Sequence, residues 1–228
     1  MRKLVLFDID GTLVLTGGAG LRAMERALEE VFGHTGGLEE IPVAGRTDWA
    51  ILADAVRRLG RGLDGPMLSD LQHRYVSHLA EEIQHPGSGR KGVMPGIRGI
   101  LDVLADRDDV LLGLLTGNFE EGARVKLGQF GLWEYFRCGA YGGDAADRNA
   151  LVPVAVERAR ALGLPDIGDA DVLVIGDTPH DVLCAQAGGA TAVAVATGSS
   201  SSAELRDAGA DYVFEDLSDT AAFLRLLE

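Results

Sequence analysis

LVLFDIDGTL, residues 4–13, is the stretch of sequence that decides the fold. It opens with four apolar residues and then passes two acids, Asp8 and Asp10, before Gly-Thr. A short apolar run that ends in a polar loop predicts a buried parallel strand, because such strands are covered on both faces of their sheet. In open α/β sheets, ligands bind outside the carboxyl ends of the strands. The two acids therefore stand where a binding site is expected.

The same pattern recurs along the chain, and helical patterns lie between the repeats. Apolar runs that read as strands occur at VLLGLLT (110–116), DVLVIGDT (171–178), TAVAVATG (191–198) and, more briefly, DYVF (211–214). Two of the intervening segments, 96–106 and 151–163, carry apolar residues at helical spacing. This alternation predicts an α/β fold with a doubly wound parallel sheet.

The region from residue 16 to residue 92 breaks that rhythm. It shows no convincing strand and three helical patterns, at 20–33, 47–60 and 66–84. We therefore expect a core domain of residues 1–15 and 93–228, with an all-α cap domain of residues 16–92 inserted after the first strand. Glycine-rich segments at 15–20 and 85–92 are the expected connections.

The composition and net charge of the chain limit the kinds of molecule that it is expected to bind. The chain has 228 residues, 46% of them hydrophobic, and a formal net charge of −14. Such a charge repels nucleic acid and anionic lipid, and a phosphate site would need a metal ion or local donors. The first apolar run stops at Asp8, which is too short for a signal peptide or a membrane span. Cys138 and Cys184 have no metal or redox spacing, so a cytoplasmic protein is expected.

Polar clusters follow three of the predicted strands. They are Asp8-Ile9-Asp10, Thr116-Gly117-Asn118 and the segment 176–181, which contains Asp177 and Asp181. Carboxylates brought this close need a counterion, and oxygen ligands favour Mg²⁺. One carboxylate could then attack phosphorus, and a second could carry the leaving group's proton. Any single cluster could instead hold turn formers and helix caps, but three clusters at three strand ends favour a site.

These residues also carry a family resemblance. FDIDGTL (7–13), LLTGN (114–118) and VIGDTPHD (174–181) resemble, in this order, the signature motifs of the haloacid dehalogenase superfamily. The resemblance covers the whole chain and is closest to phosphoglycolate phosphatases. It implies a Rossmann-like core with a helical cap, and a Mg²⁺-dependent hydrolase of small phosphomonoesters.

The resemblance also implies roles for individual residues. Asp8 would be the nucleophile and a magnesium ligand, and Asp10 the general acid and base, with its backbone carbonyl on the metal. Asp177 would bind Mg²⁺ directly, while Asp181, one helical turn on, could face the same ion. The phosphoryl oxygens would be held by Thr116, Gly117 and Asn118.

One family feature is missing. Many members have a lysine before the last motif that bridges nucleophile and phosphate, yet residues 142–159 contain none. Arg148 takes the expected position, and a guanidinium suits phosphate oxygens. The alternative is that Arg148 is a solvent-facing residue near a helix start. Lys126 is judged a poor substitute because it falls within a predicted helix, 120–130.

Reaction class and specificity rest on two further residues. The dehalogenases lack an aspartate at the position of Asp10, which favours a phosphatase here, with a phosphomutase left open. In the cap, Arg46 belongs to a Gly-Arg-Thr segment that lies over the active site in similar proteins. It could contact a substrate anion, or it could be a surface residue beside an N-cap at Thr47 or Asp48. Small anionic phosphomonoesters are therefore the expected substrates.

The segment Gly18–Ala23 permits a second interpretation, in a different class of function. The order GAGLRA matches the G-x-G-x-x-A form of a dinucleotide fingerprint, which would indicate an NAD-binding oxidoreductase or a binding module. That fingerprint needs its strand immediately before the glycines. Here about eight residues separate them, so a cap hinge is favoured.

Overall fold

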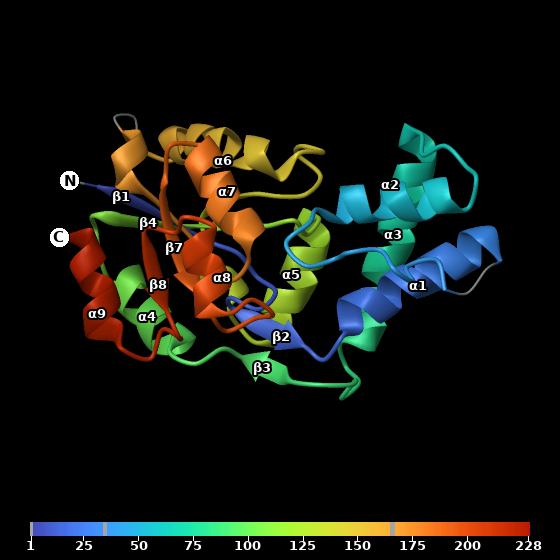
Figure 1. Ribbon diagram of the computed structural model, residues 1–228, viewed down its shortest axis with the longest axis horizontal. Helices are drawn as coiled ribbons and strands as arrows, with labels where there is room; N and C mark the ends of the chain where they lie inside the picture. Colours follow the sequence, from blue (N-terminus) through green and yellow to red (C-terminus); the bar gives the residue numbers. More distant parts are fainter. Residues whose placement is uncertain (1, 34–35, 165–166) are drawn as a thin grey trace.

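The computed structural model describes residues 2–33, 36–164 and 167–228 (Figure 1). Residue 1, at which the expected core begins, lies outside this set. Within the described residues, no helix has both the length and the apolar character needed to cross a bilayer.

A single sheet of parallel strands organises the larger part of the chain. In the described residues it has six strands in the order β5-β4-β1-β6-β7-β8. Their bounds are β1 Lys3–Phe7, β4 Val110–Leu115, β5 Cys138–Ala140, β6 Val172–Gly176, β7 Thr191–Val195 and β8 Tyr212–Phe214. The order runs outward from β1 in both directions, which opens a crevice at the carboxyl end of β1. The predicted doubly wound α/β fold is confirmed, and β5 is a strand that the sequence did not predict.

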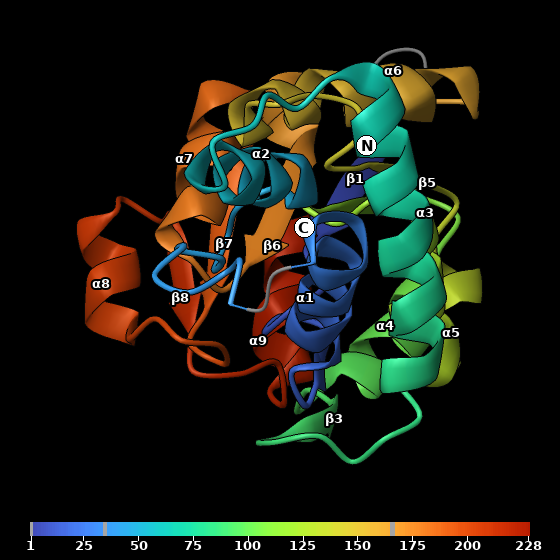
Figure 2. The same cartoon turned by 90° about the vertical axis from the view of Figure 1, so that its right-hand side faces the viewer.

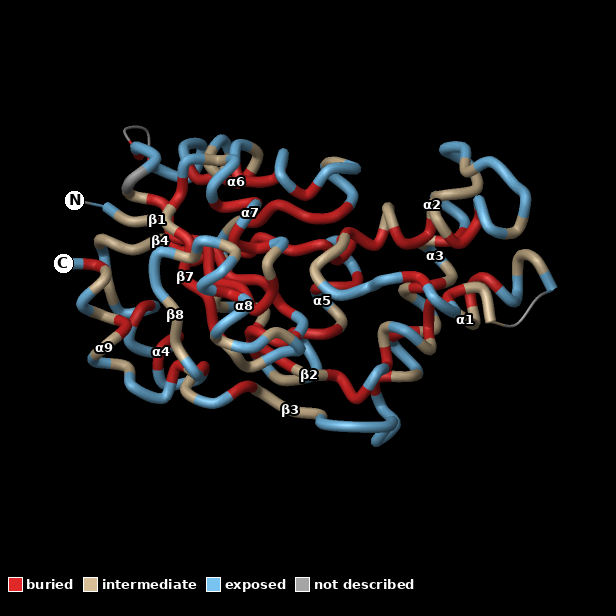
Figure 3. Tube along the Cα trace, in the orientation of Figure 1, coloured by how far each residue is buried: buried red, intermediate tan, exposed pale blue. Residues whose placement is uncertain are grey.

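Successive side chains of β1 point to opposite faces of the sheet, and both faces are covered by helices. Leu4 and Leu6 point into one hydrophobic cluster, whereas Val5 and Phe7 point into another. The Leu4 side is covered by α6 (Leu151–Ala161), α7 (Pro179–Ala187) and α8 (Ser202–Asp207). The Val5 side is covered by α4 (Ile97–Ala105), α5 (Glu120–Gln129) and α9 (Thr220–Leu224). Figure 3 shows the sheet as the buried centre of this part.

Three helices form a second block with its own core (Figure 2). They are α1 (Ala19–Phe32), α2 (Asp48–Arg58) and α3 (Gly65–Glu82), each within two residues of its predicted bounds. Their buried residues include Leu28, Leu52 and Leu79, and Phe119 of the sheet part packs among them. The division into a core of residues 1–15 and 93–228 and a cap of residues 16–92 stays a prediction.

A short ribbon joins the two parts. β2 (Val14–Thr16) pairs antiparallel with β3 (Lys91–Val93), with Thr16 opposite Lys91. These three-residue strands were not predicted, because periodicity cannot be read over so few residues. Short 3₁₀ turns complete the chain: η1 (Trp133–Tyr135), η2 (Arg148–Ala150), η3 (Asp169–Asp171) and η4 (Arg225–Leu227).

Candidate active site

A cavity of about 540 Å³ lies at the carboxyl ends of β1, β4 and β6, facing the helical block. The sheet part contributes Asp8, Asp10 and Asp177 to its wall, and the helical block contributes Arg46 and Asp48. This is the edge of the sheet at which the sequence predicted a site.

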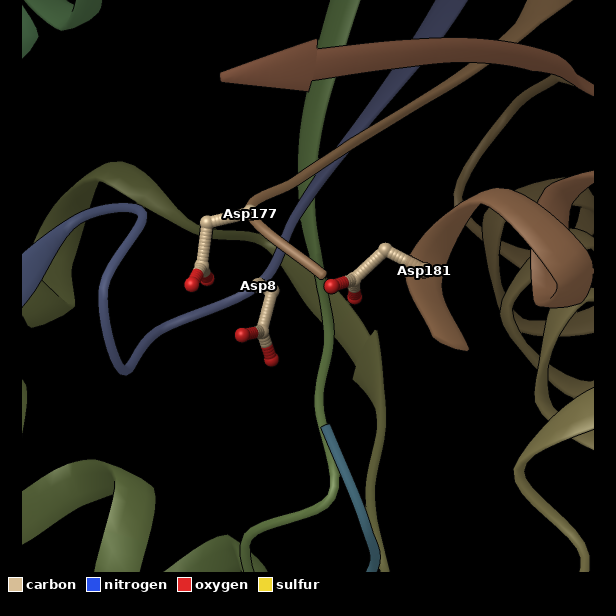
Figure 4. A group of neighbouring side chains, drawn as sticks. All are labelled: Asp8, Asp177 and Asp181. Atoms are coloured by element: carbon tan, nitrogen blue, oxygen red, sulfur yellow. The ribbon is translucent and has the colours of Figure 1, made fainter. Parts of the chain in front are cut away.

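Three buried carboxylates meet there (Figure 4). Asp8 directly follows β1, Asp177 follows β6, and Asp181 lies in the first turn of α7. One oxygen of each carboxylate lies within 4.8 Å of the others, a spacing that a single cation could bridge. Parallel neighbours β1 and β6 end at the same level, with the Asp8 amide donating to the Ile175 carbonyl at 2.9 Å. The strand register therefore brings Asp8 and Asp177 together.

The electrostatics of this cluster favour an added positive charge. Burial raises the pKa of Asp8 to about 7, and Asp181 and Asp10 add to the rise while Arg148 opposes it. Burial together with Asp181 and Asp8 raises the pKa of Asp177 to about 8. Both shifts disfavour the ionised carboxylates, so a bound cation would stabilise them.

Arg148 supplies one positive charge from within the protein. Its Nη2 lies 3.1 Å from Asp8 Oδ1 and also contacts Asp181, and its Nη1 donates to the Gly45 carbonyl at 2.9 Å. Burial opposes its charge, but Asp181 and Asp8 outweigh that effect and raise the pKa of Arg148. The side chain is buried beside the expected nucleophile, so the solvent-facing alternative is wrong.

Both oxygens of Asp181 already accept from the protein. Oδ2 accepts from the Thr178 amide at 3.0 Å and from its hydroxyl at 2.7 Å, and Oδ1 pairs with Arg148. Asp181 therefore caps the start of α7 and holds Arg148 in place.

The second predicted cluster forms a loop directly beside Asp10. Asn118 Nδ2 donates to Asp10 Oδ2 and to Thr116 Oγ1, each at 2.8 Å. Thr116 is fully buried beneath this amide. A Cβ at Gly117 would lie 2.1 Å from the Arg46 carbonyl oxygen, so only glycine lets the helical block approach this closely.

Lys126, expected to be a poor substitute for the family lysine, lies at the site. It does lie in α5, but it is buried, and its Nζ lies 2.6 Å from both Asp10 Oδ2 and Asn118 Oδ1. The inference that a helical position kept it from the site was wrong, because this position of α5 faces Asp10 and Asn118.

Arg46 lines the cavity but is engaged elsewhere. Its Nη2 lies 2.6 Å from Asp54 Oδ2, and its Nη1 donates to the Pro42 carbonyl at 3.1 Å. Thr47 is the N-cap of α2, because its hydroxyl accepts from the Ala50 amide at 3.1 Å. A substrate anion would have to compete with Asp54 for this guanidinium.

Two further contributors were missed although they lie in the opening motif. Thr12 donates its hydroxyl to Asp177 Oδ1 at 3.0 Å, which orients that carboxylate. Gly11 has a φ of 89°, and a Cβ there would lie 2.5 Å from Asp177 Oδ2. The signal was the Gly-Thr pair that follows the acids.

The dinucleotide pattern does not have the required geometry. Gly18 is the N-cap of α1 and follows β2 of the antiparallel ribbon. A phosphate-binding turn of this kind instead joins a strand of the parallel sheet to its helix.

Comparisons with known proteins agree with this arrangement. A HAD-hydrolase-like family model matches residues 150–220. A phosphoglycolate phosphatase from Rhodospirillum rubrum is 32% identical over 98% of this chain and 91% of its own length. Two solved structures share the fold. A hydrolase from Pseudomonas syringae has a TM-score of 0.70 at 24% identity, over 99% of this chain and 98% of its own. CbbY from Rhodobacter sphaeroides, solved with xylulose-(1,5)bisphosphate, has a TM-score of 0.70 at 17% identity, over 96% of each chain.

With the motif residues gathered at one edge of the sheet, the chain belongs to the haloacid dehalogenase superfamily of hydrolases. Within that superfamily it is phosphoglycolate phosphatase-like, and it is a phosphoric monoester hydrolase.

Proposed function

We propose that this enzyme hydrolyses a small phosphomonoester with the help of Mg²⁺, through a phosphorylated Asp8. The observation that carries the proposal is the meeting of Asp8, Asp177 and Asp181 within 4.8 Å, with Arg148 3.1 Å from Asp8. Four charged groups from three separate segments converge on one oxygen-rich point beside an open cavity. A structural role alone does not account for burying so much unneutralised charge.

The donor set fits a hard divalent cation. Asp8 and Asp177 would hold the ion with their side chains and Asp10 with its backbone carbonyl, and Asp181 would support the group from α7. All of these donors are oxygens, as Mg²⁺ prefers. When bound, the ion would offset the negative charge of the phosphoryl oxygens.

In the first half of the proposed reaction, a carboxylate oxygen of Asp8 forms a bond to phosphorus as the bond to the ester oxygen breaks. Asp10 gives its proton to that departing oxygen, so an alcohol leaves. Thr116, Gly117 and Asn118 hold the phosphoryl oxygens. Arg148 holds Asp8 in place, and its positive charge stabilises the negative charge of the transferring phosphoryl group.

In the second half, Asp10 takes a proton from water as that water attacks phosphorus. The bond from Asp8 to phosphorus breaks, phosphate leaves, and both carboxyl groups return to their starting states. Asp10 thus serves as acid and then as base, which is why it must stay correctly aimed in both steps.

Metal removal should act on both activity and stability. We expect Mg²⁺ to support release of phosphate from small phosphomonoesters and excess EDTA to stop it. Because the pKa values of Asp8 and Asp177 are raised to about 7 and about 8, the metal-free protein should lose stability as pH rises from about 4 to 8. Mg²⁺ should therefore raise Tm more at pH 8.5 than at pH 6, as measured by scanning calorimetry.

Asp48 is a third buried carboxyl group whose ionisation affects the pH dependence of stability. Burial raises its pKa to about 6, so it contributes to the pH dependence but not to the Mg²⁺ response. Full activity in excess EDTA, or an equal Tm increase at both pH values, would contradict the metal assignment.

We further propose that residues 16–92 are a cap that selects the substrate. The catalytic groups lie in the sheet part, and the helical block supplies the opposite wall of the cavity, including Arg46 and Ile51. A cap of this kind can close over the site and exclude water and large ligands. Small anionic phosphomonoesters such as phosphoglycolate should therefore outperform nucleotides and phosphoproteins.

Arg46→Ala should raise KM for phosphoglycolate about three- to fivefold, the range of a partly exposed charge contact. KM for p-nitrophenyl phosphate, which has no carboxylate, should hardly change. Asp54→Asn is the matched variant: it releases the guanidinium of Arg46 and should lower KM for phosphoglycolate. A substrate panel read out as inorganic phosphate checks both, and equal effects on the two substrates would remove Arg46 from recognition.

A cytoplasmic location is also retained as a proposal. Cys138 and Cys184 are both free thiols, as is usual in a reducing compartment.

A further inference from the structure

Two donors converge on one oxygen of Asp10. Oδ2 accepts from Lys126 Nζ at 2.6 Å and from Asn118 Nδ2 at 2.8 Å. Among the described residues, no hydrogen bond is found to Asp10 Oδ1. Because both donors occupy Oδ2, Oδ1 is the oxygen of Asp10 that can exchange a proton with the leaving group.

Lys126 also determines which way the Asn118 amide faces. Its Nζ lies 2.6 Å from Asn118 Oδ1, so the amide nitrogen must turn toward Asp10 and Thr116. Without the ammonium, the amide could rotate and present its oxygen to the Asp10 carboxylate instead. Lys126 therefore acts on Asp10 both directly and through Asn118.

The helical block encloses Lys126 from the other side. Asp48 of α2 attracts its charge, and the Tyr75 hydroxyl of α3 hydrogen-bonds Asp48. A Cβ at Gly20 of α1 would lie 3.3 Å from Lys126 Nζ, which leaves the ammonium little room to move. The Lys126 side chain is only 6% exposed.

We infer that Lys126 is a positioning residue for the general acid, holding Asp10 so that Oδ1 faces the leaving-group oxygen. This rests on the proposed function, in which Asp10 carries that proton. An alternative role, binding an anionic part of the substrate, fits less well. The ammonium already faces the carboxylates of Asp10 and Asp48, so little of its charge remains for a ligand.

The test is the dependence of Lys126→Met on the leaving group. An alkoxide needs a proton as it departs, whereas p-nitrophenolate leaves without one. We expect kcat to fall on the order of 100-fold for glycerol phosphate and phosphoglycolate, but less than about fivefold for p-nitrophenyl phosphate. Lys3→Met is the matched control: it removes the same charge, but its ammonium pairs with Asp171 at 3.0 Å, outside the residues that line the cavity. It should leave all three rates unchanged.

Asp10→Ala separates the inference from the proposed function. This variant should show the same leaving-group dependence, and adding Lys126→Met to it should cost little more, because the group being positioned is gone. If Asp10→Ala slows all three substrates equally, the acid role fails and the inference with it. If Asp10→Ala discriminates but Lys126→Met does not, only the inference fails.

Two other outcomes would also overturn the inference. A rise in KM confined to phosphoglycolate would make Lys126 an anion-binding residue. A full Lys126→Met effect that persists in the Asp10→Ala background would make it act elsewhere. If Lys126→Met does not fold, Lys126→Met/Asp48→Asn removes the buried charges together and should show the same leaving-group dependence.

Discussion

Asp8→Asn should lower kcat at least about 1,000-fold, as loss of a covalent nucleophile does in other enzymes. The amide oxygen is a poor nucleophile toward phosphorus, and the neighbouring carboxylates are engaged by other groups of the protein, Asp177 by the Thr12 hydroxyl. Asp10 is held by Lys126 and Asn118, and Asp181 is engaged by Thr178 and Arg148. The measurement is steady-state phosphate release by freshly purified protein.

The fold should survive this change. Asn has the same shape as Asp, and removing one of several crowded carboxylates relieves repulsion within the cluster. Tm in the absence of metal should therefore be equal to that of the wild type or higher. Turnover within tenfold of the wild type would exclude the covalent mechanism.

Arg148→Ala should cost on the order of 2–4 kcal/mol in transition-state stabilisation, the usual loss for one preorganised electrostatic group. Its guanidinium contacts Asp8 and Asp181, so the variant also leaves two buried carboxylates without their cation. The same variant should therefore be less stable than the wild type, and more so at pH 8.5 than at pH 6. Paired measurements of kcat/KM and Tm in saturating Mg²⁺ check both effects.

Arg148→Lys is the informative companion. It keeps the charge but cannot reach Asp8, Asp181 and the Gly45 carbonyl with one planar group. We expect it to recover part of the activity and most of the stability. If Arg148→Ala keeps nearly the kcat/KM of the wild type, Arg148 has only a structural role. The metal alone would then offset the negative charge of the phosphoryl group.

The site residues that follow strands could be predicted from the sequence alone. Asp8, Thr116 and Asp177 each come directly after an apolar run, and parallel strands necessarily end at one edge of their sheet. Arg148 was found by its place between motifs, because few basic residues lie in that segment. The fold class followed from the same strand and helix alternation.

The environments of Lys126 and Arg46 could not be predicted from the local sequence pattern. Lys126 reads as an ordinary helical residue, since nothing local indicates that α1, α2 and α3 will cover its face of α5. Arg46 precedes α2, so helical spacing could not reveal its pairing with Asp54 at 2.6 Å. The environment of Lys126 depends on how segments distant in sequence pack together, whereas the pairing of Arg46 depends on how the residues before α2 fold back onto that helix.

The ribbon of β2 and β3 has a consequence for how such enzymes diversify. The chain leaves the sheet part at Thr16 and re-enters at Lys91, and these residues are direct partners in the ribbon. A segment whose ends are adjacent can be exchanged with little disturbance to its host. Two crossovers in the gene, one on each side of this segment, would exchange the helical block, which we propose selects the substrate, and would keep the residues that follow the strands. The ribbon therefore marks the place at which such an exchange would disturb the sheet part least.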